Sequence, residues 1–353
     1  MDHIDRIDRM RRFATLARWL GPWADARRVP EVRHGRRRGG RVLVIPGLHP
    51  LGVADPRMVR FGRILEAAGA ELAMADIGAL KRLTLAPSMF EEAEAALFRA
   101  SSRGPVGIMS VSFGSIIALH LAAHHPERVR RLVLFGGYRE LETTLSHALG
   151  GSPGEVRDPL NAPAVFIQLA DELLESAAHR EAFVDAARRF CAETWTSGRG
   201  GPADDKLDGR HLRVGARIAE TLPGPARELM RLACRLDGDP MPTALGALSR
   251  ARERFRYLDP GPLVAKVRCE VDCVHGRDDD VIPHTQSEQL ARDLGGRAHI
   301  TGLYGHTGAR VGTAMAADRR SMTQALEALS AAVREARVMA GVLGALERLV
   351  SPH

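Results

Sequence analysis

A serine lies where a side chain could be activated as a nucleophile, between an apolar run and a helix. The apolar run Val106–Met109 predicts a strand, and Ser110-Val111-Ser112-Phe113-Gly114 follows it directly. A sharp strand-to-helix turn requires small residues two positions before and after its central residue, and it leaves that central side chain above the sheet. Ser110 and Gly114 meet this requirement around Ser112. The pattern therefore favours Ser112 as the nucleophile, with Ser110 as its rival.

The same turn offers a group that could stabilise negative charge. The backbone N–H of Phe113 comes at the start of a predicted helix over residues 114–124. Amide groups at a helix N-terminus point toward bound anions. We therefore expect the Phe113 N–H to be one donor of an oxyanion hole.

Candidate acids follow the apolar run Val271–Val274, which predicts another strand. The adjacent carboxylates Asp278, Asp279 and Asp280 come soon after it, in the segment 275–283. Flanking carboxylates in a loop are usually solvated, and one of them could cap the next helix. The residue types alone do not choose among the three.

His306 is a candidate base, in the segment Leu303-Tyr304-Gly305-His306-Thr307 after a short predicted strand at Ala298–Ile300. The chain has 14 histidines, so only position can distinguish them. His49 and His284 compete with His306, because both lie in loops expected to face the same crevice.

These segments, in this order, resemble the α/β-hydrolase superfamily over residues 41–137 and 268–335. In that superfamily the catalytic residues follow one another as serine, acid and histidine. Its penultimate strand commonly ends in Gly-x-x-Asp-x-x-x-Pro, a frame that begins here at Gly276. The resemblance therefore implies Asp279 as the acid that orients the base. It implies His306, just after the final strand, as the base.

The resemblance extends to a loop near the start of the core. The predicted strand Val42–Ile45 leads into Pro46-Gly47-Leu48-His49, which is similar to the His-Gly loop of the superfamily with Pro46 in place of the histidine. The backbone N–H of Leu48 would then be the second oxyanion donor, and the alternative is a plain Pro-Gly turn. Ser110 is the other departure, since the usual pattern around the nucleophile is Gly-x-Ser-x-Gly.

The surrounding elements predict how these residues are positioned. Short apolar runs alternate with helical patterns before residue 137 and again after residue 268, which indicates a parallel sheet with helices on both faces. Between residues 138 and 267 helical signals continue without a convincing strand. We therefore expect the α/β-hydrolase fold, a mostly parallel sheet with an inserted helical cap. The expected segments are a basic helical extension at 1–40, the first part of the core at 41–137, the cap at 138–267, and the second part of the core with C-terminal helices at 268–353.

The two ends of the chain allow alternatives. Apolar residues fall on a broad arc of a predicted N-terminal helix, at Ile4, Ile7, Met10, Phe13, Ala14, Ala17 and Leu20. That helix could pack on the core. Alternatively residues 1–23, with arginines on one side and Trp19 and Trp23 at the end, could contact a membrane surface. The C-terminal helix, Ala331–Val350, could pack on the core or on a partner chain.

Composition restricts location and partners. The net charge is +7, but only three of the 50 basic residues are lysine and no nucleic-acid motif accompanies them, so we expect no nucleic-acid partner. No apolar run is long enough to span a membrane and no secretory signal precedes the core, which favours the cytoplasm. The cysteines form no CxxC pair or zinc pattern. We expect Cys269 and Cys273 to be buried free thiols.

The chemistry implied is cleavage of a carboxylic ester or thioester through an acyl-enzyme on Ser112, with His306 as base and Asp279 as orienting acid. It requires no metal or organic cofactor. A serine nucleophile argues against dehalogenases and epoxide hydrolases of this fold, which use aspartate. An acyltransferase with the same residues, or a non-catalytic binding protein on this fold, are the alternatives. The substrate is expected to be a small, apolar ester or acyl compound. Apolar cap residues indicate such a pocket unless they form the cap's own core: Phe166, Ile167, Leu169, Leu173 and Leu174.

Overall fold

The centre of the structure is a sheet of six parallel strands in the order β2-β1-β3-β4-β5-β6. A computed structural model describes residues 3–21, 28, 30, 39–152, 158–196, 209–306, 308–309 and 322–352. The strands are β1 (Arg41–Ile45), β2 (Glu71–Met74), β3 (Val106–Val111), β4 (Val129–Phe135), β5 (Glu270–Gly276) and β6 (Arg297–Thr301). Because the strands are parallel, their carboxyl ends meet at one edge of the sheet, where Ser112, Gly136 and Gly276 lie.

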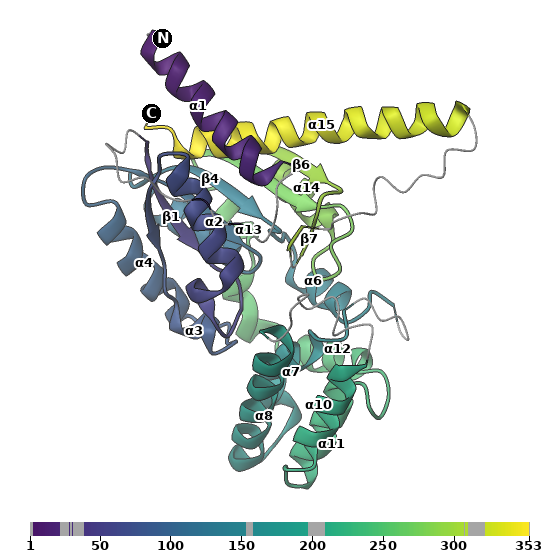
Figure 1. Ribbon diagram of the computed structural model, residues 1–353. Coiled ribbons are helices and arrows are strands. Elements are labelled where there is room, and N and C mark those ends of the chain that lie inside the picture. Colours follow the sequence, from purple (N-terminus) through teal and green to yellow (C-terminus); the bar gives the residue numbers. More distant parts are fainter. Residues whose placement is uncertain are drawn as a thin grey trace.

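Helices cover both faces of the sheet, as the alternation of the sequence predicts (Figure 1). One face packs against α4 (Ser88–Ala100), α5 (Gly114–His124) and α14 (His284–Asp293). The other face packs against α1 (His3–Leu20), α2 (Pro56–Ala67) and α15 (Met322–Val350). Successive strand residues alternate between the two hydrophobic clusters. Leu43 and Ile45 belong to the first, and Val42 and Val44 to the second.

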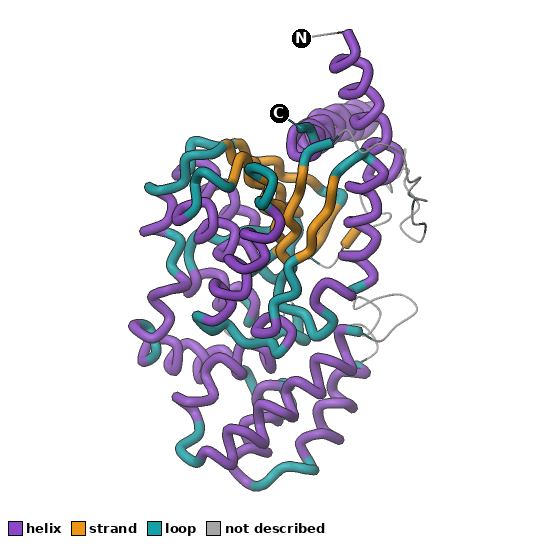
Figure 2. The backbone as a smooth tube through the Cα atoms, turned by 90° about the vertical axis from the view of Figure 1, so that its left-hand side faces the viewer, coloured by secondary structure: helices purple, strands orange, loops and turns teal. Residues whose placement is uncertain are grey.

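The long connection between β4 and β5 is helical in its described parts, residues 138–152, 158–196 and 209–267, and contains no strand there (Figure 2). Its elements are α6 (Leu141–Ala148), α7 (Ala162–Leu173), α8 (Ala177–Trp195), α10 (Arg210–Ala219), α11 (Gly224–Ala233), α12 (Met241–Arg250), η2 (Glu253–Leu258) and α13 (Gly261–Val264). The segment lies below the sheet in Figure 1, beyond the carboxyl ends of the strands. Phe166, Phe183 and Phe190 are fully buried and form its own core.

Helix α1 packs on the chain's own elements with part of the apolar arc that the sequence suggests. Leu16 and Leu20 are buried against α15 and α2, whereas Ile7, Met10 and Phe13 of the predicted apolar arc are exposed. Arginines as well as apolar residues determine which side of α1 faces the rest of the molecule. Arg9 Nε and Arg12 Nε lie 3.3 and 3.1 Å from the carboxylate oxygens of Glu347, which is buried in α15. Trp23 lies outside the described residues, and membrane contact through residues 1–23 stays a prediction.

The C-terminal helix packs on this chain's own sheet. On this helix, Met339, Val342 and Leu346 are buried against the sheet. The preceding turns at residues 330–334 are exposed and extend beyond the rest of the molecule in Figure 1. Of the two cysteines expected to be buried, Cys273 is buried and Cys269 half-buried, and both are free thiols. Across the described residues, no helix combines the length and apolarity that crossing a membrane requires.

Candidate active site

The turn between β3 and α5 holds Ser112 in a backbone conformation that side chains rarely adopt. Its φ is +53°, in the left-handed region. The turn packs tightly against the loop after β1, because a Cβ at Gly114 would clash with the carbonyl of Pro46. Gly47 is equally close, since a Cβ there would lie 3.0 Å from the Cβ of Ser112. These contacts explain physically why the sequence has small residues around Ser112.

The structure separates the two candidate serines. Ser110 is fully buried within β3, whereas Ser112 lines a cavity at the carboxyl end of the sheet. Among the described residues, none forms a hydrogen bond with the Ser112 hydroxyl. Its backbone N–H donates to the carbonyl of Phe135 on the neighbouring strand, at 2.7 Å. The backbone of Ser112 is therefore held by a hydrogen bond, while its side chain faces the cavity.

Asp279 is the buried member of the three adjacent carboxylates, while Asp278 is exposed and Asp280 half-buried. Its Oδ1 accepts hydrogen bonds from the backbone N–H groups of Val281 and Ile282, at 2.9 and 2.8 Å. Its Oδ2 accepts from Nδ1 of His306 at 2.9 Å. These bonds fix the orientation of the carboxylate relative to the imidazole. The bond to Asp279 occupies Nδ1 of His306 and not its other ring nitrogen, Nε2.

His306 lies in the turn of a small antiparallel hairpin, between β7 (Tyr304–Gly305) and β8 (Gly308–Ala309). The hairpin packs directly on the end of β5. A Cβ at Gly276 would clash with the carbonyl of Tyr304, so the glycine of the Gly-x-x-Asp frame permits this close approach. Gly276 thus helps to place Asp279 and His306 together.

Burial and charge act in opposite directions on Asp279 and His306. Burial raises the pKa of Asp279, but the charge of His306 and the hydrogen bonds from His275 and His306 outweigh it and hold that pKa far below its usual range. Burial lowers the pKa of His306, yet the charges of Asp279, Asp280 and Asp158 raise it above its ordinary value of 6.5. Asp279 therefore remains an anion at neutral pH and favours the protonated imidazole.

Two further polar residues belong to the site and were not identified from the sequence. His275, at the end of β5, is buried, and its Nε2 lies 3.2 Å from Oδ2 of Asp279 and 2.9 Å from the carbonyl of Ile282. Because both of these are acceptors, Nε2 carries a proton. Asp158, from the helical segment, is buried in the cavity wall near His306. The available signal for His275 was its place at the carboxyl end of a predicted strand, directly before the Gly-x-x-Asp frame, whereas Asp158 had none.

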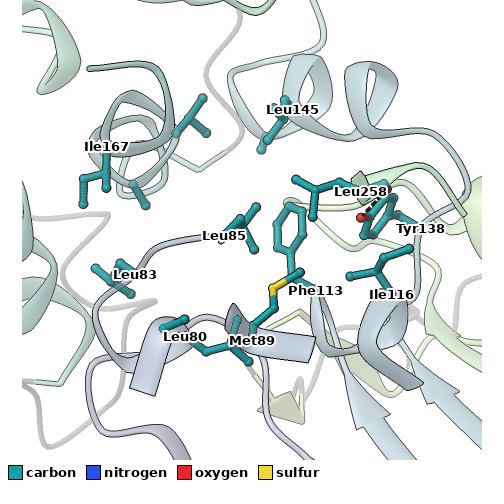
Figure 3. Packing of buried hydrophobic residues seen from close by; sticks show 14 of the residues in the cluster. Leu80, Leu83, Leu85, Met89, Phe113, Ile116, Tyr138, Leu145, Ile167 and Leu258 are labelled. Carbon is teal, nitrogen blue, oxygen red and sulfur yellow. Dashed lines mark hydrogen bonds between the residues drawn. The ribbon is translucent and has the colours of Figure 1, made fainter. Parts of the chain in front are cut away.

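The predicted oxyanion donors belong to the same region. Phe113 and Leu48 both line the cavity. The ring of Phe113 is anchored in the core, 5.2 Å from the ring of Tyr138 and close to Leu85, as Figure 3 shows. Phe113 precedes α5, where amide groups have no partner within the helix.

The rival histidines are placed differently. His49 lines the cavity, but its Nδ1 accepts the N–H of Leu51 at 3.2 Å, and its ring faces Trp195 of α8 at 6.2 Å. Nδ1 of His284 lies 3.0 Å from the carbonyl of Arg277, and His284 does not line the cavity. Of the three histidines considered from the sequence, His306 is thus the one that hydrogen-bonds to Asp279.

The cavity has a volume of about 380 Å³ and runs between the sheet and the helical segment. Its apolar wall in the helical segment comes from Leu145, Ala148, Leu160, Ala164, Val165 and Trp195, and the same segment adds the polar residues Asp158, Asn161 and Gln168. Of the two alternatives that the sequence left for five apolar residues, the structure shows packing within the helical segment and not in the cavity wall: Phe166, Ile167, Leu169, Leu173 and Leu174. In the described ranges, no three His, Cys, Asp or Glu side chains gather as metal ligands would.

Comparisons with known proteins were made by sequence and by structure. The sequence matches no protein-family model and no curated protein. In structure, the chain is similar to acylaminoacyl peptidase from Pyrococcus horikoshii, with 10% identity and a TM-score of 0.39, over 77% of this chain and 34% of that one. It thus spans about a third of that enzyme's length.

Two further solved structures are similar. One is from a study of carboxylesterases of Nitrososphaera gargenis, with 17% identity and a TM-score of 0.40, over 77% of this chain and 85% of that one. The other is a serine hydrolase from Cycloclasticus zankles, with 15% identity and a TM-score of 0.38, over 83% of this chain and 89% of that one. These similarities are remote. The assignment of the fold therefore rests on the strand order, the parallel crossovers and the turn at Ser112.

Proposed function

We propose that this chain, which has the α/β-hydrolase fold, is a serine hydrolase that cleaves a carboxylic ester or thioester at Ser112. The observation that carries the proposal is the hydrogen bond of 2.9 Å between His306 Nδ1 and Asp279 Oδ2, on the wall of the cavity that Ser112 also lines. A buried carboxylate oriented toward an imidazole is the arrangement that makes histidine an effective base. The turn between β3 and α5 places the Ser112 side chain on the wall of the same cavity.

In the first half of the reaction, His306 Nε2 takes the proton of the Ser112 hydroxyl. Oγ forms a bond to the carbonyl carbon, and the carbonyl electron pair moves to oxygen. The backbone N–H groups of Phe113 and Leu48 would stabilise this oxyanion, each by about 3 kcal/mol. The intermediate then collapses, and the leaving alcohol or thiol receives the proton from His306.

In the second half, water replaces the alcohol. His306 takes a proton from water, the hydroxide bonds to the acyl carbon, and collapse of the second intermediate returns the proton to Ser112. Asp279 remains ionised throughout and stabilises the imidazolium in both halves. His275 acts on Asp279 and would be a positioning residue, since it donates to the same carboxylate oxygen as His306.

A panel of p-nitrophenyl esters tests the proposal. We expect hydrolysis by the wild-type protein and loss of roughly a thousandfold or more in kcat/KM for Ser112→Ala and for His306→Ala. Ser110→Ala is the matched control, because Ser110 is buried beneath the turn and does not line the cavity. Activity that survives Ser112→Ala would overturn the assignment of the nucleophile.

A further inference from the structure

The cavity at Ser112 also extends to the opposite face of the sheet. Part of its wall comes from the face covered by α1, α2 and α15, away from the helical segment. We call this part the rear chamber. Its walls are Leu20, Met58, Arg60, Phe61, Val111, Phe135, Val274, Tyr304, Val342 and Leu346.

The register of the sheet shows that the rear chamber lies on the second face. Val111, Phe135 and Val274 are paired across β3, β4 and β5 and form one row at the carboxyl ends of the strands. Side chains in one row of a parallel sheet point to the same face. All three contact the hydrophobic cluster of α15. The preceding row, which includes Leu134 and Cys273, belongs to the cluster on the other face.

Of the two glycines that flank Ser112, Gly136 leaves room for a chain to pass between the two faces, whereas Gly47 packs against Ser112 itself. Gly47 follows β1 and Gly136 follows β4, and these are the strands that flank β3. Both glycines line the cavity. A Cβ at Gly136 would lie 3.8 Å from Cε1 and Nδ1 of His306 and would narrow the space beside the base. The rear chamber is thus continuous with the site at Ser112.

The chemistry of the rear chamber selects an apolar occupant. Its walls are aliphatic, aromatic or thioether side chains apart from the hydroxyl of Tyr304 and the guanidinium of Arg60. The Tyr304 hydroxyl donates to the carbonyl of Leu20 at 2.7 Å, and Arg60 Nη2 donates to the carbonyl of Trp19 at 3.0 Å, so both polar groups are held by the end of α1. A polar group there would lose its hydration without gaining a partner. Apolar cavities of this kind stay dry and take apolar ligands.

We propose that the rear chamber binds the apolar chain of the substrate, so that the chain reaches Ser112 from the face of the sheet covered by α1, α2 and α15. This inference rests on the proposed hydrolysis at Ser112 and specifies its substrate as an ester with an extended apolar chain. Leu20 closes the chamber at the end of α1. That end is held by Tyr304 and by Arg60, whose Nη2 donates to the carbonyl of Trp19 at 3.0 Å.

To test this, larger side chains are substituted into the walls of the rear chamber, and the preference of the enzyme for long or short substrate chains is measured. Met58→Trp is the main variant, because Met58 is half-buried on α2 and a larger side chain there is least disruptive. Val342→Phe fills the chamber from α15. Val59→Trp is the matched control, since Val59 is exposed on the same helix and lies outside the cavity. Val165→Phe narrows the cavity in the helical segment instead.

Two ester series distinguish which chain occupies the chamber. One series lengthens the acyl group of p-nitrophenyl esters from acetyl to decanoyl, and the other lengthens the alcohol of acetate esters. We expect Met58→Trp and Val342→Phe to lower the long-to-short ratio of kcat/KM by about tenfold or more in one series. Val59→Trp should leave the ratio at the wild-type value.

A binding measurement separates this inference from the proposed hydrolysis. Affinity for cis-parinaric acid, a fluorescent apolar chain, is measured in a Ser112→Ala background, with and without the filling substitutions. A loss of about tenfold in affinity with Met58→Trp supports the chamber even if no ester is hydrolysed. The inference is overturned if Met58→Trp and Val342→Phe change neither binding nor the chain-length ratio while Val165→Phe changes both.

Discussion

The orientation and the charge of the Asp279 side chain are both determined by its hydrogen-bond partners. Both of its oxygens are occupied, one by two backbone N–H groups and the other by His306 and His275. Each partner favours the charged form, which is why the buried carboxylate stays ionised. The same negative charge raises the pKa of His306. Activity that depends on neutral His306 must therefore fall as the pH decreases through that raised pKa.

The pH dependence can be tested without altering the hydrogen-bonded pair. The charge of Asp280 helps to raise the pKa of His306, so Asp280→Asn should lower it and shift the acid limb of the kcat/KM profile to lower pH. Asp278→Asn is the control, because the exposed Asp278 is not among the groups that shift His306. Ester hydrolysis measured across the acid range checks both. An acid limb displaced equally in the two variants would contradict this account.

Among elements, the β7–β8 hairpin connects the base to the N-terminal helix. Tyr304 lies two residues before His306, and its hydroxyl holds the last carbonyl of α1. Burial raises the pKa of Tyr304 to about 12, so this hydroxyl remains a donor at any pH near neutrality. The position of α1 and that of the loop that carries His306 are therefore connected through one side chain.

Removing that hydroxyl should loosen α1. Tyr304→Phe leaves the Leu20 carbonyl without its donor, at a cost of about 1–2 kcal/mol. We expect faster amide hydrogen exchange in the last turns of α1 and a lower free energy of unfolding. Tyr257→Phe removes a comparable bond to the carbonyl of Leu85, and it should leave exchange in α1 unchanged. Unchanged exchange in α1 of Tyr304→Phe would show that the remaining contacts of the helix hold it without this hydrogen bond.

At the scale of the whole molecule, a buried carboxylate ties distant segments to the sheet. Asp272 of β5 is fully buried and contacts Arg131 of β4, Arg297 and His299 of β6, and Arg348 of α15. Burial raises the pKa of Asp272, but the hydrogen bonds from His299, Arg297 and Arg348 outweigh it and lower that pKa far below its unfolded value of 3.8. The native state is thus stabilised by the ionised form.

Asp272→Ala should lower the free energy of unfolding by about 3 kcal/mol at pH 7, because it leaves the surrounding cations without their shared anion. The pKa is depressed, so the stabilising contribution is complete above pH 3.8 and is lost as the pH falls below it. Denaturant titrations at pH 7 and pH 5 should therefore show equal losses, with a smaller loss at pH 3. A loss that grows as the pH falls from 7 to 3 would contradict the assignment.

The sequence predicts local features of this molecule better than features made by distant segments. The turn at Ser112 and the alternation of strands and helices depend on residues that are adjacent in the sequence. The parallel sheet confirms the predicted fold. Only part of the predicted apolar arc of α1 packs on the core, because the orientation of the helix also depends on Glu347, more than 300 residues away. The rear chamber could not be predicted either, since α1, α2 and α15 form it together.

The central claim is that Ser112 is an activated nucleophile, and labelling with a fluorophosphonate probe tests it most directly. The folded wild-type protein is labelled, digested, and analysed by peptide mass spectrometry. We predict a single adduct on Ser112 that is lost in His306→Ala and kept in Ser110→Ala. An adduct on another residue, or none on the folded protein, would contradict the account.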